Sequence, residues 1–410
     1  MTPKTPKDNK RSPVRDLTSS KNETESILFT DQSEAKDVEL VSESSATFAA
    51  SGKSAKPMIK RLPVETQTLY NELLEHLQVA DFMRSFSALS GNFLIRERGE
   101  GQYWYFRTSE GPESRPSEFY LGPDNDATRL LMATYKEGRT AVIDSESRSI
   151  RLTSMLRSGG LAMTDAASAK IIKGFGAAGV FKLGGVLIGT HAFVAIGNSL
   201  GVNWPSSVST QDVDFGTPRQ IDFGIPQTPQ LLADLPTTVE SLAMGFIPRI
   251  HIHNDVKPTS FVVLGKDWRI DLLTTPQGAD RDTPVFIPRF KTHAQPLAFM
   301  EYCLDKTMNA IIVNGGSTLV RVPEPARFAI HKLLVASNRT KESFSKIEKD
   351  RLQAYLVLSF LEEERPGDIT IAAEDACNRG PSWHRRIREQ ASRLPRVIPE
   401  LQDVLDKAKH

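Results

Sequence analysis

The sequence predicts an α/β (α+β) fold in which helices pack on a mixed β-sheet, with a small β-rich module before this core and a helical domain after it. Three observations favour this class. An apolar run at 183–188 leads into a glycine turn and a helix, and two short apolar strands at 212–215 and 268–274 carry aspartates. After residue 325 the apolar residues recur at helical spacing. Strands and helices followed by helices alone are typical of an α/β core with an appended helical domain.

Composition limits the classes of protein to consider. The chain has 410 residues, and 51 basic against 50 acidic residues leave a net charge of +1. This near-neutral balance does not indicate a protein that binds nucleic acid through an overall basic surface. Any basic surface must be local. Its two cysteines, Cys303 and Cys377, are too few for a disulfide framework or a zinc set, and we expect buried thiols.

No segment of the sequence has the pattern of a membrane helix. The longest apolar stretch, 183–197, is short and is interrupted by glycines and His191. The first residues lack the apolar region of a secretory signal. We therefore expect a cytoplasmic protein without a membrane partner.

The length allows two or three domains at about 100–200 residues each. We expect a disordered arm at 1–60, because these residues are rich in Lys, Ser, Thr and Glu and cannot bury enough apolar surface to offset the entropy of ordering. A helix with a small antiparallel β module follows at 61–157. The α/β core occupies 158–324, and the helical domain occupies 325–410.

The β module invites two interpretations. Apolar residues at helical spacing predict a helix over 66–86, and short β-prone runs between glycines predict an antiparallel meander over 90–122. Its aromatic residues either form the core of the module or stack nucleic-acid bases while nearby arginines hold phosphates. We favour the core. The residues concerned are Tyr103, Trp104, Tyr105, Arg96, Arg98 and Arg107.

The core begins with helices and then alternates with strands. Helical patterns cover 124–137 and 143–157, and Thr164 is the expected N-cap of a helix that ends at Gly179. A strand over 181–189 and a helix over 190–200 follow. The later expected elements are a helix at 228–244, a hairpin of 260–264 with 268–274, strands at 297–304, 308–313 and 318–322, and helices at 325–339, 341–364, 368–378, 382–394 and 398–407.

The residues that carry chemistry lie on the two aspartate strands. Asp212 and Asp214 are two apart, so both side chains project from one face of a strand while Val213 and Phe215 point to the other. Asp271 is likewise flanked by apolar residues. Three carboxylates beside a glycine turn suit divalent cations that carry a triphosphate, because such cations prefer oxygen ligands and the turn offers backbone N–H groups to phosphate.

These features resemble a known superfamily. Gly189-Thr190, Asp212-x-Asp214 and a later lone Asp271 are similar to the marks of nucleotidyltransferases of the DNA polymerase β superfamily. The GTHAF turn and the T-x-D-h-D-F strand (h apolar) more closely resemble bacterial nucleotidyltransferase-like proteins related to abortive-infection toxins. The resemblance spans roughly residues 60–365. The connection between Thr190 and Asp212 is longer than in many small members of the superfamily, although the closer relatives share this extension.

The resemblance implies roles for the site residues. Asp212, Asp214 and Asp271 would be the catalytic residues and the ligands of Mg²⁺ or Mn²⁺, and Asp271 would also accept a proton. Gly189 and Thr190 would bind the triphosphate of an NTP. The alternative for Gly189 is a plain strand-to-helix turn.

Two residues of the helical part match the family's further nucleotide-binding positions. Lys332 would reach toward the triphosphate, although a solvated helix face explains it equally well. Arg339 belongs to a second family stretch with Lys349 and Asp350, and the alternative is a set of surface ion pairs.

Two other residues near these motifs are weaker candidates for the site. His191 follows the turn directly, and we expect it to be structural because no ligand set accompanies it. Asp222 is a candidate additional metal ligand.

The implied reaction moves a nucleoside monophosphate from an NTP to a hydroxyl. An RNA or tRNA 3′ end is the first expected acceptor and a protein hydroxyl the second. A toxin or phage-defence role, with an antitoxin-type protein partner, is compatible with either acceptor. The alternative is a catalytically inactive protein of this fold that binds nucleic acid or a partner.

Overall fold

The computed structural model describes most of the chain after the N-terminal arm. The expected arm at 1–60, apart from its last two residues, lies outside this part, as do Asp222 and residues 228–232 of the helix expected at 228–244. The described ranges are 59–82, 90–98, 101–108, 118–205, 212–218, 233–249, 257–276, 282–340 and 343–408.

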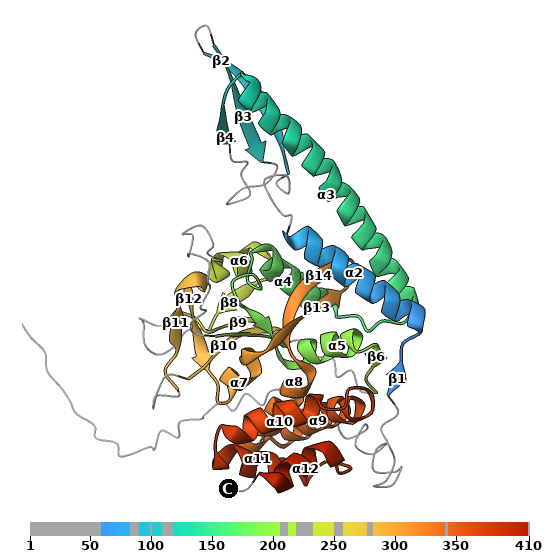
Figure 1. Ribbon diagram of the computed structural model, residues 1–410. Coiled ribbons are helices and arrows are strands. Elements are labelled where there is room, and N and C mark those ends of the chain that lie inside the picture. The colour runs from blue at the N-terminus through green and yellow to red at the C-terminus, as the bar shows by residue number, and fades with distance from the viewer. Residues whose placement is uncertain are drawn as a thin grey trace, which may run out of the picture.

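A mixed sheet forms the centre of the molecule, which confirms the predicted α/β class (Figure 1). The strand order is β11-β12-β10-β7-β5, with β9 also paired to β10 and β8 paired to β9. Strand β10 runs parallel to β7 and β12 and antiparallel to β9. The strands are β5 (Val186–Leu187), β7 (Asp212–Thr217), β8 (Phe246–Pro248), β9 (Ser260–Val263), β10 (Arg269–Thr274), β11 (Val285–Ile287) and β12 (Thr292–Pro296).

One face of this sheet is packed by aromatic residues. Phe215 on β7 lies with its ring centroid 4.4 Å from that of Phe175 on α4 (Ala166–Ala177) and 5.9 Å from that of Phe181. All three rings are buried. The helix α6 (Leu235–Ser241) contacts α4 on the same side. The N-cap of α4 is Asp165, whose carboxylate accepts from the Ser168 N–H, so the prediction that Thr164 caps this helix was wrong by one residue.

A hairpin and two helices complete the core. The hairpin of β13 (Thr307–Val313) and β14 (Ser317–Pro323) is confirmed, and its turn contains Gly315 and Gly316 at positive φ. The strand expected at 297–304 is wrong, because Met300–Asp305 form the helix α7. Four of its six residues are buried, and such a short apolar run has no periodicity that separates helix from strand. The helix α5 (Gly189–Ser199) contacts both β7 and β13.

The N-terminal module projects from the core. A long helix, α3 (Asp126–Ser158), joins the two helical patterns expected at 124–137 and 143–157 and carries a three-stranded sheet at its far end (Figure 1). The predicted meander is thereby confirmed. Its strands are β2 (Gly91–Arg98), β3 (Gly101–Thr108) and β4 (Glu118–Pro123).

The two faces of the small sheet differ. Phe93 and Phe106 pack against Tyr135 of α3, with ring centroids 5.0 and 5.1 Å away. Strand alternation places Tyr105 and its partner Tyr120 on the other face, where Tyr120 is 57% exposed. Trp104 shares the face of Phe106, whereas Tyr103 and Tyr105 lie on the other face, and all three side chains are only half-buried. Base stacking by the tyrosines stays a prediction.

The C-terminal part is helical, and its helices lie on the opposite side of the molecule from α2 (Val64–Phe82) and α3 (Figure 1). Both cysteines are free and buried, as expected. No helix within the described ranges is long and apolar enough to cross a membrane. The remaining elements are α8 (Pro325–Asn338), α9 (Phe344–Glu364), α10 (Asp368–Asn378), α11 (Pro381–Ala391), α12 (Pro399–Lys407), η3 (Pro288–Phe290), and β1 (Lys60–Arg61) paired with β6 (Val202–Asn203).

A buried hydrogen bond joins α2 to the β13–β14 hairpin. The buried N–H of Ile311 donates to the Tyr70 hydroxyl at 3.1 Å. Tyr70→Phe leaves this N–H unpaired and should lower the free energy of unfolding by about 1–3 kcal/mol, measured by urea denaturation. The exposed Tyr120→Phe serves as control, with an expected change below about 0.5 kcal/mol. Equal stability of the two variants would contradict this contact.

Candidate active site

Strand pairing brings the three predicted aspartates to one face. In the parallel register of β7 and β10, Asp214 lies opposite Asp271, and Asp212 lies opposite Arg269. The alternate residues of both strands are buried on the other face, where Val213, Phe215, Ile270 and Leu272 are at most 1% exposed. The aspartates therefore share the less covered side of the sheet, which we call the carboxylate face.

The glycine turn lies directly against this face. Gly189 begins α5 at a φ of +68°, and a Cβ built there would lie 2.3 Å from Oδ2 of Asp214. A side chain at this position would collide with the carboxylate, so Gly189 is more than a plain turn residue. Its helix begins without a side-chain cap, which leaves backbone N–H groups of the first turn beside Asp214. Free N–H groups at a helix N-terminus favour phosphate.

The carboxylate face concentrates negative charge. Burial and the charges of Asp271 and Asp212 raise the pKa of Asp214 to about 7. Burial and the charge of Asp271 also raise the pKa of Asp212. Lys332 and Arg269 counteract this rise at Asp214. A bound cation would therefore gain electrostatic energy here, because it would relieve repulsion among groups that cannot all ionise freely.

The donor set fits Mg²⁺ or Mn²⁺ in its chemistry, because all three groups are carboxylates and hard cations prefer oxygen ligands. The side chains do not converge, however. Within the described ranges no three His, Cys, Asp or Glu side chains form a group that could hold one ion. Asp271 instead accepts from Arg269 Nε at 2.8 Å through Oδ1. Binding of one ion by all three aspartates would require Asp271 to leave Arg269.

A buried carboxylate, Asp350, holds the predicted lysine in an ion-pair network. Asp350 is 2% exposed and accepts from Lys332 Nζ at 2.7 Å and from Arg339 Nε at 2.8 Å. Burial by itself would raise the pKa of Asp350, but the charges of Lys332 and Arg339 hold it below its usual value. The alternative of a solvated helix face for Lys332 is wrong, because its side chain is only 12% exposed. Arg339 forms a cross-helix ion pair, as its alternative held, although its partner Asp350 lies in the interior.

This network and the carboxylate face are electrostatically linked. Lys332 lowers the pKa of Asp214, and Lys346 and Lys349 on α9 lower that of Asp212. Positive charge on the C-terminal helices therefore faces the aspartates of the sheet. This is the arrangement that a polyphosphate carried by a cation requires.

His191 lies in the interior beside the turn. It is 4% exposed, and its Nε2 has no hydrogen-bond partner in the part of the chain that the structure describes. Burial lowers the pKa of His191 to about 4, so the ring is neutral at pH 7. The adjacent Thr190 is also buried.

The long connection after α5 is anchored where the structure describes it. Trp204 stacks on Phe193 of α5 with ring centroids 5.0 Å apart, and its Nε1 donates to the Phe193 carbonyl at 2.9 Å. The start of this insertion therefore packs on the helix that follows the glycine turn.

Two residues of the site were missed by the sequence reasoning. Arg269 stands two residues before Asp271, so strand periodicity already placed both on one face, and this signal was available. Asp350 was noted only as part of a family stretch. Its role as the shared partner of Lys332 and Arg339 depends on the packing of α8 against α9.

Strand-borne carboxylates, a helix N-terminus and a lysine are the kinds of group that phosphoryl-transfer sites use. A family model described as Nucleotidyltransferase matches residues 166–378, from α4 to α10. This match covers more than half of the chain, and the chain belongs to this nucleotidyltransferase family. Its general activity is transfer of a nucleoside monophosphate, with an NTP as substrate. No curated protein and no solved structure matches the chain.

The raised pKa of Asp214 predicts an effect of pH on stability. Between about pH 4 and pH 7 the folded chain keeps a proton on Asp214 that the unfolded chain has lost, since the ordinary pKa is 3.8 and the folded value is about 7. The free energy of unfolding of the wild type should therefore fall with rising pH relative to that of Asp214→Asn. Urea denaturation in EDTA measures this.

Asp124→Asn is the control for this experiment, because the pKa of Asp124 is lowered to about 2 by its hydrogen bonds with Arg129 and Trp104. Its difference from the wild type should be flat above about pH 5, because Asp124 is then ionised in both the folded and the unfolded chain. If the free energy of unfolding changes equally with pH in the wild type and in Asp214→Asn, the pKa of Asp214 is not raised by folding.

The buried network predicts a large effect for Asp350→Asn. The amide keeps the shape but removes the charge shared by Lys332 and Arg339. Breaking a buried pair costs about 3–5 kcal/mol in free energy of unfolding, measured by denaturation. Glu389→Gln breaks an exposed pair with Arg393 and should cost less than about 1 kcal/mol. Similar losses in both variants would show that Asp350 is not part of a buried network.

Proposed function

We propose that the chain is a metal-dependent nucleotidyltransferase of the DNA polymerase β type that moves a nucleoside monophosphate from an NTP to a hydroxyl acceptor. The observation that carries the proposal is the register of β7 and β10, which places Asp214 opposite Asp271 and Asp212 on the same face. Gly189 against Asp214 and the positive charge of Lys332 support it. The family match supplies the class of reaction.

In this reaction the acceptor oxygen forms a bond to the α-phosphorus of the NTP. The bond from that phosphorus to the bridging oxygen breaks, and pyrophosphate leaves. Asp212, Asp214 and Asp271 would hold Mg²⁺ or Mn²⁺, which when bound stabilises negative charge on the phosphates and lowers the pKa of the acceptor hydroxyl.

The chain's own residues have separate roles in this proposal. Asp271 accepts the proton of the acceptor hydroxyl. The N–H groups at Gly189 and Thr190 donate to the phosphates, and Lys332, oriented by Asp350, adds positive charge. The buried neutral His191 has a structural role beside the turn.

The acceptor we propose first is an RNA or tRNA 3′ end, with a protein hydroxyl second. The GTHAF turn and the T-x-D-h-D-F strand support a relationship to abortive-infection toxins, and hence a toxin or phage-defence role with an antitoxin-type partner. The exposed tyrosine face of the N-terminal module is compatible with an RNA acceptor, because aromatic side chains stack on bases without regard to sequence.

The second candidate is a protein that keeps this fold and binds nucleic acid or a partner without turnover. The observation in its favour is the ion pair of Arg269 with Asp271, together with the lack of a convergent ligand group in the described ranges. The same experiment separates the two candidates.

We expect purified wild type, incubated with each α-labelled NTP, Mg²⁺ or Mn²⁺, and either total tRNA or whole-cell protein, to transfer label to one acceptor class. Asp212→Ala combined with Asp214→Ala should reduce transfer by more than about a hundredfold, since changes to outer-shell partners alone cost up to that factor. The exposed Asp403→Ala is the matched control and should retain full transfer.

Two outcomes decide between the candidates. Transfer that disappears only in the double variant establishes the enzyme and identifies base and acceptor class together. Absence of transfer to every acceptor, with no metal-dependent NTP binding, would reject the enzyme in favour of the binding protein.

A further inference from the structure

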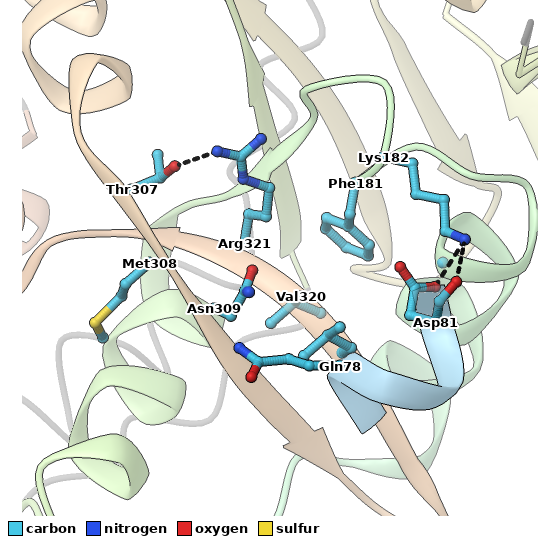
Figure 2. Close-up of a pocket in the computed structure, with 11 residues that line it drawn as sticks. Gln78, Asp81, Phe181, Lys182, Thr307, Met308, Asn309, Val320 and Arg321 are labelled. Carbon is cyan, nitrogen blue, oxygen red and sulfur yellow. Dashed lines mark hydrogen bonds and ion pairs between the residues drawn. The ribbon is translucent and has the colours of Figure 1, made fainter. Parts of the chain in front are cut away.

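A separate pocket lies between the last turn of α2 and the β13–β14 hairpin (Figure 2). Its volume is about 610 Å³, within the range of small-molecule sites. Helix α2 covers the hairpin at Ile311, where Tyr70 accepts the backbone hydrogen bond. The pocket opens farther along the same strand, at Thr307 and Asn309. Gly176 at the end of α4 and the turn that follows it, with Phe181 and Lys182, contribute the remaining wall. Other residues that line the pocket are Gln78, Asp81, Phe181, Lys182, Leu319 and Arg321.

This pocket is distinct from the carboxylate face. Phe181 lines it and packs against Phe215, which points away from Asp214 on β7. None of the three aspartates, Gly189 or Lys332 lines the pocket. A ligand bound there would therefore lie on the opposite side of the sheet from the proposed NTP site.

The pocket carries a cation without a counter-charge. Arg321 donates to the Thr307 hydroxyl at 2.9 Å and forms no ion pair with any residue in the described ranges. Lys182, by contrast, is paired with Asp81 at 3.0 Å at the other end of the pocket. The lining is therefore left with a net positive charge at Arg321. The planar guanidinium presents several N–H donors in a fork that matches phosphate oxygens.

Polar and apolar groups surround this charge. The side chains of Gln78 and Asn309 point into the pocket and make no hydrogen bond to other described residues (Figure 2). Leu319 is half-buried and provides apolar surface beside them. Side-chain amides combine donor and acceptor in the geometry that base edges present. An anionic group with a flat, polar-edged ring satisfies all of these features.

We propose that this pocket binds a nucleotide unit, with its phosphate on Arg321 and its base against the amides of Gln78 and Asn309. The unit is either a free nucleoside monophosphate or one nucleotide of a single strand, since both present the same phosphate and base. Binding here needs no divalent cation. The site is independent of the proposed nucleotidyl transfer.

Calorimetric titration of the full chain in EDTA tests the proposal, because removal of divalent ions suppresses metal-dependent binding at the carboxylate face. The probes are AMP and a six-residue oligoadenylate. We expect saturable binding by the wild type and a loss of affinity of at least about tenfold in Arg321→Ala, since a hydrogen bond to a charged group contributes about 1.5–3 kcal/mol. Asn309→Ala should weaken binding several-fold.

Control variants separate this site from the rest of the molecule. Arg148→Ala removes an arginine outside the pocket, and Asp214→Asn alters the carboxylate face, so both should bind as the wild type does. Tighter binding of the oligonucleotide identifies a strand as the source, and equal or tighter binding of AMP identifies the free nucleotide. No saturable binding of either probe, or equal affinity in Arg321→Ala and the wild type, would overturn the proposal.

Discussion

The parallel pairing of β7 with β10 is the constraint on which the rest of the site depends. It sets Asp214 opposite Asp271 and, in the same register, Asp212 opposite Arg269. A shift of β10 by one residue would turn Arg269 and Asp271 into the packed face and expose Ile270 and Leu272. The burial of Val213 and Phe215 against α4 therefore fixes the carboxylates on the other side. Hydrophobic packing, rather than any attraction among the aspartates, assembles the site.

Positively charged residues partly offset the electrostatic cost of placing these aspartates together. Burial and the like charges of Asp271 and Asp212 raise the pKa of Asp214 to about 7, and Lys332 and Arg269 moderate the effect. Lys332 is itself held by the buried Asp350, which Arg339 also contacts. The C-terminal helices thus do more than close the core, because they bring positive charge to the carboxylate face. The site remains short of positive charge, which is the condition under which a divalent cation binds well.

Local pattern was sufficient to predict the aspartate strands, the glycine turn and the C-terminal helices, because each has a clear periodicity or turn residue. The strand expected at 297–304 failed because six residues of α7 are too few to show a period. The burial of Asp350 and the pairing of Arg269 depend on contacts between elements, which one sequence does not encode locally. The pocket at Arg321 likewise arises where α2 ends above the hairpin, and no motif marks it.

We propose that the three aspartates form one metal–nucleotide site. Anomalous diffraction from crystals grown with Mn²⁺ and a non-hydrolysable NTP tests it most directly. We expect Mn²⁺ bound by Asp212, Asp214 and Asp271, with Asp271 released from Arg269 and the triphosphate against the Gly189 turn. Mn²⁺ bound elsewhere, or an NTP seated with the Arg269–Asp271 ion pair intact and no ion on the aspartates, would contradict it.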